Sequence, residues 1–347
     1  MKHLIASSPR PLKRLALAGF ICLGSLATAQ MAMAADLTVR LAWYMPPNTA
    51  VSAQGEEIAQ QIEKLSDGDI AVQTFPSGSL LKESNIGQGI ANNTTNMGIL
   101  GMHWWSNQAP SLAWDTIPFL VDDASDLLTA LHGPLGKDVD KTLNKFGVKV
   151  VGWGFYGYAE SYLNTKKPIK TPSDLKGLKM RSEGKLSAEF LKSQGATPVA
   201  VDSSEVYTAM QRGTLDGGVS GMSSIVSRKW YEVGDYITAI HYVPLVYPIQ
   251  VNRNWWENEL TDAQRATIEK AVASTESDAV KEIEDEFKRQ IAMAEKHGNK
   301  VYRPSDDDLQ KWREATTEQA KKSYLEDAGD AGQKILADFQ QSASTDK

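Results

Sequence analysis

The stretch KTPSDLKGLKMRSEG, residues 170–184, predicts a short helix, then a strand, then a single arginine at the end of that strand. Thr171 precedes a proline and stands three residues before Asp174, the spacing of a helix N-terminus with a capping box. Gly177 ends the helix, and apolar and cationic residues then alternate as in a strand with one buried face. Arg181 is therefore expected at the carboxyl end of a strand, where open α/β sheets collect ligands.

The sequence on both sides of this stretch alternates between strand and helix patterns. A strand, a helix and a second strand occupy residues 36–75, and that order predicts parallel pairing. The fold class is therefore expected to be α/β. The predicted strands are residues 36–43, 69–75, 96–100, 148–158, 178–181, 197–201, 214–220, 235–243 and 246–252.

Residues 261–297 predict one long helix. Thr261 and Gln264 form a capping box, apolar residues recur at helical spacing, and Gly298 follows the end. At 1.5 Å per residue such a helix is about 54 Å long, longer than one small domain is wide, so we expect it to brace two lobes. The alternative is a break near STES, residues 274–277, which gives two shorter helices. A final helix pair is predicted to begin after Ser305.

The first 34 residues predict a secretory signal peptide. Basic residues precede the apolar run LALAGFICLGSLATA, and AMA at residues 32–34 is a typical cleavage site, so the mature chain is expected to begin at Ala35 in the periplasm. The alternative is a membrane anchor, but the run is short, and no later stretch could span a bilayer, so stable membrane insertion is not expected.

The net charge of the chain bears on its partners, and its length bears on the number of domains. The leader holds four of the 37 Lys and Arg residues and none of the 43 Asp and Glu residues, so the mature chain has a net charge of −10. Such a surface argues against nucleic acid and anionic lipid as partners. A mature chain of about 313 residues predicts two domains at roughly 150 residues each.

Catalytic and metal-binding signals are absent from the sequence. The single cysteine, Cys22, lies in the leader, which excludes disulfides, thiol nucleophiles and cysteine ligands from the mature chain. The histidines lie far apart with no metal-binding spacing, and there is no nucleophile elbow, phosphate loop or dinucleotide fingerprint. We therefore expect no metal, no cofactor and no enzymatic activity.

Aromatic residues gather instead at the ends of predicted strands. Small-molecule sites are built from a few aromatic walls and polar anchors, so some of these side chains are expected to face a cleft, whereas most tryptophans are core residues. The pair Trp255 and Trp256 is interpreted as packing. The candidate wall residues are Trp43, Tyr44, Trp104, Trp105, Trp153 and Tyr158.

Four segments together resemble one protein family. KTPSDLKGLKMRSEG, GATPVAVDSSEVYTAMQRGTLDGG, KWYEVGDYIT and LTDAQRATIEKA are similar, in this order, to the extracytoplasmic solute-binding proteins of TRAP (tripartite ATP-independent periplasmic) transporters, the dicarboxylate-binding-protein-like family. The resemblance implies a monomeric, two-lobed periplasmic receptor that closes its cleft on a small organic acid and docks on TRAP membrane subunits. We expect residues 35–160 with 247–286 to form lobe I, and residues 161–246 with 287–347 to form lobe II.

The resemblance also implies roles for individual residues. The arginine at the GLKMR position, here Arg181, forms a salt bridge with the ligand carboxylate, and a planar guanidinium suits such bidentate binding. Ser220 stands where the family usually has a polar side chain that contacts ligand. Many members carry a second arginine before the KPI segment, whereas this chain has Glu160 and Ser161 there.

The departure at Glu160 bears on the ligand. A carboxylate there would repel a second acid group, which disfavours simple dicarboxylates. A hydroxy acid, sugar acid or sulfonate, with its hydroxyls donating to Glu160, is one expectation, and an amine-bearing or zwitterionic solute is the other. Glu160 could instead pair with Lys166 or Lys167. A receptor for a sensor kinase, or an exported enzyme that holds a carboxylate with Arg181, are the functional alternatives.

Overall fold

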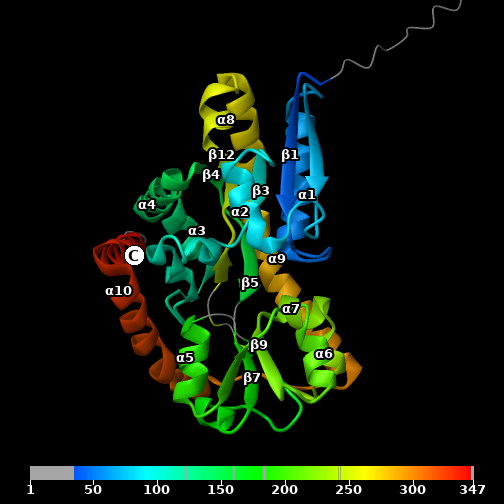
Figure 1. The fold of residues 1–347 in the computed structure, drawn as a ribbon, viewed down its shortest axis with the longest axis vertical. Helices are drawn as coiled ribbons and strands as arrows, with labels where there is room; N and C mark the ends of the chain where they lie inside the picture. Colours follow the sequence, from blue (N-terminus) through cyan, green and yellow to red (C-terminus); the bar gives the residue numbers. More distant parts are fainter. Residues whose placement is uncertain are drawn as a thin grey trace, which may run out of the picture. The chain divides into compact units, whose positions relative to one another are not determined.

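The computed structural model describes residues 35–121, 123–158, 161–182, 185–240, 242 and 244–344. The predicted signal peptide and Glu160 lie outside these residues. Within them, strands and helices alternate and form two separate mixed sheets (Figure 1). This arrangement confirms the predicted α/β class.

The first sheet is the centre of lobe I and has the strand order β2-β1-β3-β12-β4. β1 pairs in parallel with β2, as predicted for residues 36–75, whereas β12 is antiparallel to both of its neighbours. A strand from late in the chain therefore completes the middle of this sheet. The elements are β1 (Leu37–Trp43), β2 (Ile70–Phe75), β3 (Met97–Ile99), β4 (Val148–Gly152), β12 (Ile249–Asn252), α1 (Ala50–Leu65), α2 (Glu83–Ala91), α3 (Ala124–Leu131), α4 (Pro134–Leu143), α8 (Arg253–Asn258), and the 3₁₀ helices η1 (Met102–Trp105), η2 (Pro110–Thr116) and η3 (Asn144–Phe146).

The second sheet is the centre of lobe II and has the order β13-β10-β6-β9-β7-β8. The predicted capping box of Thr171 and Asp174 is present and opens a 3₁₀ helix before β7. β7 runs parallel to β8 and β9, which places the end of each strand at one edge. The elements are β6 (Ser161–Asn164), β7 (Lys179–Ser182), β8 (Thr197–Ala200), β9 (Gly217–Ser220), β10 (Tyr236–Thr238), β13 (Lys300–Tyr302), α5 (Lys185–Ser193), α6 (Val206–Gln211), α7 (Met222–Ser227), η4 (Pro172–Leu175) and η5 (Trp230–Glu232).

A short two-stranded ribbon connects the sheets. β5 (Phe155–Tyr158) leads from lobe I toward lobe II, and β11 (Pro244–Val246) returns antiparallel to it, with Pro244 opposite Tyr158. In Figure 1 this ribbon lies between the two sheets. The chain thus crosses between lobes here in both directions.

The long helix α9 is continuous from Asp262 to His297. Its capping box of Thr261 and Gln264 and its left-handed C-cap at Gly298 confirm the predicted ends, and the alternative break at residues 274–277 is wrong. α9 packs on α1 and β4 of lobe I and on α7 and β13 of lobe II. It therefore spans both lobes, as expected.

The last helix, α10 (Asp306–Ser344), also connects the lobes. Ser305 accepts a hydrogen bond from the Asp308 N–H at its start, and Gly329 kinks it, which confirms the predicted helix pair. Trp312 donates to the Lys170 carbonyl beside lobe II, while Tyr324 donates to the Ser111 carbonyl in lobe I. In Figure 1, α10 runs along both α4 and α5.

The buried side chains form two clusters that follow the alternation of the strands. In β6, Leu163 packs into the larger cluster, which is continuous with lobe I, and Tyr162 into a smaller one on the opposite face of the lobe II sheet. Trp255 and Trp256 are buried in the larger cluster, so the predicted packing role is confirmed. The two-lobed architecture is thus as expected, and the detailed boundaries at residues 160, 246 and 286 stay predictions.

Candidate functional site

Arg181 lies at the carboxyl end of β7 and is fixed by backbone acceptors. Its Nε donates to the Val201 carbonyl at 3.2 Å and its Nη1 to the Val219 carbonyl at 2.8 Å. The guanidinium carbon lies 5.8 Å from the centre of the Trp230 ring, a cation–π arrangement. These two carbonyls fix the orientation of the half-buried guanidinium, and a planar guanidinium held in this way suits bidentate binding of an anion.

A glycine on the neighbouring strand lies directly beside Arg181. Gly218 of β9 pairs with Arg181, and a β-carbon there would lie 3.3 Å from the Trp230 ring and 3.5 Å from the Arg181 β-carbon. Without a side chain, β9 leaves the arginine and the indole close together. The glycine-rich DGGVS sequence therefore belongs to the support of Arg181.

Two serines lie opposite each other where β9 ends and β6 begins. Ser220 is the last residue of β9, is 2% exposed, and pairs with Ser161, the first residue of β6. Ser161 is fully buried, and its hydroxyl has no hydrogen-bond partner in the part of the chain that the structure describes. A buried hydroxyl in this state can be satisfied by a ligand.

Lobe I contributes a group of aromatic side chains linked by hydrogen bonds. The hydroxyls of Tyr44 and Tyr247 lie 2.6 Å apart, and the Trp104 indole N–H donates to the Tyr44 hydroxyl at 3.3 Å. Tyr247 in turn packs against Tyr156, with ring centres 5.5 Å apart. Burial raises the pKa of Tyr44 well above its ordinary value, so its hydroxyl stays neutral. The group offers aromatic faces together with hydroxyl groups.

Glu83 relates the two groups. It is the first residue of α2 in lobe I, and burial raises the pKa of its carboxyl, while the Tyr44 hydroxyl and the positive charges of Arg228 and Arg181 lower it. Both arginines belong to lobe II, so the pKa of Glu83 depends on positive charges that lie across the lobe boundary. The Arg228 Nε is buried and has no hydrogen-bond partner among the described residues.

Sequence reasoning missed Glu83 and Arg228. Glu83 lies in the first turn of its helix, α2, a place where acidic residues are common for reasons of helix stability alone. Arg228 stands next to the exposed Lys229 in the sequence and has no pattern of its own. Their shared environment arises only when the two sheets come together, and no signal in the sequence pointed to it.

The remaining predicted wall residues lie in supporting positions. Trp43 is fully buried and donates to the Ser52 hydroxyl at 3.0 Å, and Trp105 donates to the Gln250 side chain and stacks on Phe146. These two rings thus fill the interior of lobe I.

Trp153 and Tyr158 connect to the long helix. The Trp153 backbone N–H donates to Glu276 at 2.8 Å, and the Tyr158 hydroxyl donates to Glu284. Tyr158 also packs edge-to-face on Phe287, and its pKa is raised, first by burial. Both aromatic residues therefore attach the β4–β5 segment to α9.

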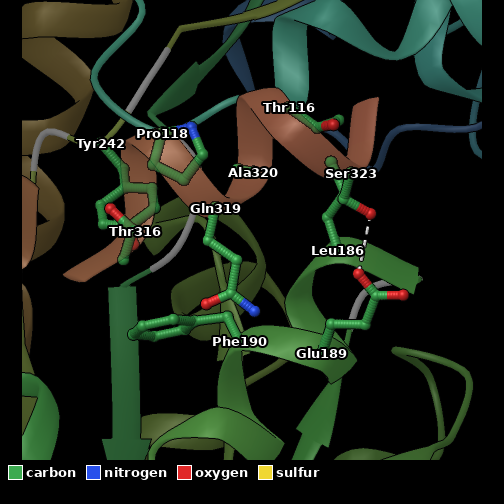
Figure 2. A pocket seen from close by; sticks show the side chains of 10 residues that line it. All are labelled: Thr116, Pro118, Leu186, Glu189, Phe190, Tyr242, Thr316, Gln319, Ala320 and Ser323. Carbon is green, nitrogen blue, oxygen red and sulfur yellow. Dashed lines mark hydrogen bonds between the residues drawn. The ribbon is translucent and has the colours of Figure 1, made fainter. Parts of the chain in front are cut away.

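A separate cavity lies away from these residues. Figure 2 shows it between α5, α10 and the segment around Pro118, with Ser323 donating to Glu189 at 2.9 Å. Its volume is about 20 Å³, which is room for roughly one water molecule. It is too small for an organic acid, so the residues around Arg181 are the better candidate site.

Other kinds of site find no support within the described ranges. No group of three or more His, Cys, Asp or Glu side chains there could hold a metal ion. Among the helices of these ranges, none combines the length and the apolar character needed to cross a bilayer.

Comparison with known proteins identifies the family. The sequence profile of DctP, the bacterial extracellular solute-binding protein family 7, matches residues 41–327. The chain belongs to this family. Family 7 proteins are extracellular solute-binding proteins, so this protein is a solute-binding receptor and not an enzyme.

Relatives within family 7 cover most of the chain. A solute-binding protein of Verminephrobacter eiseniae is 29% identical over 81% of this chain and 83% of its own length. The C4-dicarboxylate-binding periplasmic protein DctP of Rhodobacter capsulatus is 27% identical over 72% and 75% of the two chains.

Solved structures share the family 7 fold. A TRAP periplasmic solute-binding protein from Desulfovibrio salexigens with bound orotic acid has a TM-score of 0.81, with 22% identity over 89% of this chain and 99% of that one. The sugar acid binding protein DctPAm of Advenella mimigardefordensis, in complex with galactonate, has a TM-score of 0.78, with 21% identity over 88% and 98%. At this identity the likeness shows the fold alone.

Proposed function

We propose that the protein captures a small organic anion by closing its two lobes and delivers it to TRAP membrane subunits for uptake from the periplasm. One observation carries the proposal: Arg181 stands at a strand end, where the carbonyls of Val201 and Val219 orient its guanidinium. A guanidinium held in this way loses little entropy on binding a carboxylate bidentately.

The proposed ligand is a hydroxy acid, a sugar acid or a sulfonate. Arg181 binds the acid group, and the ligand's hydroxyls meet Ser220, Ser161 and the Tyr44–Trp104 pair. Glu83 is a further acceptor for hydroxyl donors, and Arg228 is a second donor. Similar structures hold galactonate and D-glucuronate, which are acids of this kind.

The second candidate is an amine-bearing or zwitterionic solute. Glu160 would then be the counter-charge, and aromatic faces would contribute cation–π attraction. Glu83 would be a second carboxyl group in addition to Glu160, and two carboxyl groups favour a ligand that carries an amine. Trp104 and Tyr44 are the proposed walls, whereas we assign Trp43, Trp105, Trp153 and Tyr158 a supporting role.

Calorimetry with purified protein tests the anchor. D-glucuronate, galactonate, pyroglutamate, isethionate and ethanolamine are titrated into the parent protein, Arg181→Gln and Arg181→Lys. We expect Arg181→Gln to lower the affinity for the bound acid by about 30-fold or more, because truncating one partner of a buried charge pair costs about 2–5 kcal/mol. Arg181→Lys keeps the positive charge but lacks the planar guanidinium that binds a carboxylate bidentately, so we expect an intermediate loss of affinity.

Lys179→Gln is the matched control, because Lys179 is an exposed cation on the same strand. Its affinity should equal that of the parent. Unchanged binding by Arg181→Gln would refute the anchor, and preferential loss of ethanolamine binding in Glu160→Gln would favour the second candidate. Delivery is tested by uptake of the identified ligand into vesicles that contain the two membrane subunits.

A further inference from the structure

Glu286 of α9 connects the two lobes through both oxygens of its carboxyl group. Oε2 accepts the backbone N–H of Ala50, the first residue of α1 in lobe I, at 2.9 Å. Oε1 accepts the hydroxyl of Ser223, the second residue of α7 in lobe II, at 2.8 Å, and also the Gln290 side chain. The three side chains are nearly inaccessible, with Glu286 only 4% exposed.

The position of Ser223 relates this cluster to the ligand site. Ser223 follows Ser220 of β9 by three residues, and the carbonyl of Val219 in the same strand orients Arg181. On the other side, α1 packs on β1 and β2 of lobe I. Movement of one lobe away from the other would therefore remove a partner from Glu286 and admit water to its carboxyl group.

We propose that lobe closure takes up a proton at Glu286, so that acidification favours the closed receptor. The inference rests on the lobe movement in the proposed function, a hinge motion typical of periplasmic binding proteins. Burial between α1, α7 and α9 removes the carboxylate from water, whereas the open form hydrates it, and the two forms consequently differ in proton affinity.

The charges around Glu286 do not compensate its burial. On α9 itself, Glu282 opposes ionisation and Arg289 favours it. The acids Glu56 and Glu57 of α1 are exposed, and α7 contains no ionisable residue before Arg228. From β5, the hydroxyls of Tyr156 and Tyr158 are hydrogen-bonded to Ser224 and Glu284, and the residues of this strand, Phe155–Tyr158, include no cation.

The direction of the effect follows from linkage. Burial between the two lobes raises the pKa of Glu286 to about 7 in this structure, whereas a hydrated glutamate has a pKa of about 4.3. Between these values the closed form binds more protons than the open form, so falling pH stabilises closure. The ratio of closed to open receptor should rise by up to about tenfold per pH unit in this window.

Spin labels measure the lobe distance without any ligand. Residues 35–347 contain no cysteine, so Lys64→Cys on α1 and Lys192→Cys on α5 give two exposed, unique labelling sites. Pulsed electron–electron double resonance measures the distance between the two labels. Between pH 5 and pH 8 it should show that the population of the closed form grows as the pH falls. In the Glu286→Gln background, which replaces the titrating group with a neutral isostere, this pH dependence should disappear.

Two further variants keep the test decisive. Glu282→Gln removes a half-exposed acid one turn away that opposes ionisation of Glu286, so it should keep the slope of the parent's pH dependence and move the midpoint to lower pH. Ser223→Ala removes a hydrogen bond to the ionised carboxyl, so its midpoint should move to higher pH even if Glu286→Gln fails to fold. Identical distance distributions of the parent at pH 5 and pH 8, or an unchanged slope in Glu286→Gln, would overturn the proposal. The affinity of Arg181→Gln decides the proposed function separately.

Discussion

At the scale of single residues, Asp115 is a buried carboxyl group at the connection between lobes. It lies in η2 with no exposed surface, and its Oδ2 accepts the Val246 N–H of β11 at 3.2 Å. Burial raises the pKa of Asp115 to about 8, and the backbone hydrogen bonds from Val246 and from Asp115 itself lower it by less. The side chain is therefore mostly neutral at pH 7 and becomes a buried charge at alkaline pH.

Asp115 should make the folded protein less stable as the pH rises. Its folded pKa of about 8 exceeds the unfolded value of 3.8, so its stabilising contribution is complete below about pH 4 and is lost as the pH rises through 8. The loss is at most about 1.4 kcal/mol per pH unit. Urea unfolding at pH 5, 6, 7 and 8 measures it.

The comparison uses Asp115→Asn, which mimics the neutral acid and should show a flatter pH dependence than the parent. Asp126→Asn, at an exposed acid of α3, is the control and should follow the parent. Parallel curves for the parent and Asp115→Asn would contradict the assignment to this residue.

At the scale of elements, β9 depends on two neighbouring glycines for different reasons. A β-carbon at Gly217 would lie 2.1 Å from the Leu163 carbonyl of β6, a clash with backbone that no side-chain movement relieves. A β-carbon at Gly218 would meet its nearest neighbour, the Trp230 ring, at 3.3 Å, which a small shift accommodates. Alanine substitutions at Gly217 and Gly218 therefore test how tightly β9 packs against β6 and against the Trp230 ring.

We expect Gly217→Ala to lower the free energy of unfolding by about 1–3 kcal/mol or more, because overpacking forces the backbone to move. Gly218→Ala, the matched neighbour, should cost less. Chemical denaturation gives both values, and equal losses in the two variants would show that contact with the β6 backbone is not the cause.

The elements also show which features the sequence could predict. Helix ends at Thr171, Thr261 and Gly298 were predictable because the groups that form a cap lie within four residues of each other. Arg181 was expected at a strand end by the same local reasoning. The direction in which a tryptophan side chain points was not predictable. Trp43 and Trp104 both lie near the end of a predicted strand, yet Trp43 donates to Ser52 in the interior and Trp104 donates to Tyr44.

Glu83 and Arg228 were missed for a related reason. Each residue belongs to a different lobe, and their mutual influence depends on how two sheets pack rather than on any spacing along the chain. Patterns of three or four residues predict elements and caps, whereas a site shared between lobes depends on tertiary structure.

At the scale of the molecule, α9 and α10 each pack on both lobes. Neither lobe can unfold without exposing buried side chains of a helix that the other lobe holds. We expect the protein to unfold in one cooperative transition, with far-ultraviolet circular dichroism and tryptophan fluorescence changing together. Trp114 in lobe I and Trp312 on α10 beside lobe II are both fully buried and report on the two regions.

Trp114→Phe and Trp312→Phe each remove one of the nine tryptophans, one from each of the two regions. Each single variant should keep the coincidence of the two probes in urea. Two resolved transitions, or a fluorescence midpoint that differs between the variants while circular dichroism does not, would show that the lobes unfold independently.

The position of β12 affects how the chain can be made. Ribosomes complete β3 and β4 by residue 152, but the strand that joins them ends at residue 252. Where the chain folds as it emerges N-terminus first, the edges of β3 and β4 therefore lack their partner until about 100 further residues have appeared. Such edges are templates for aggregation. A chaperone that covers β3 and β4 during this interval would therefore raise the yield of the protein more than one that acts after release.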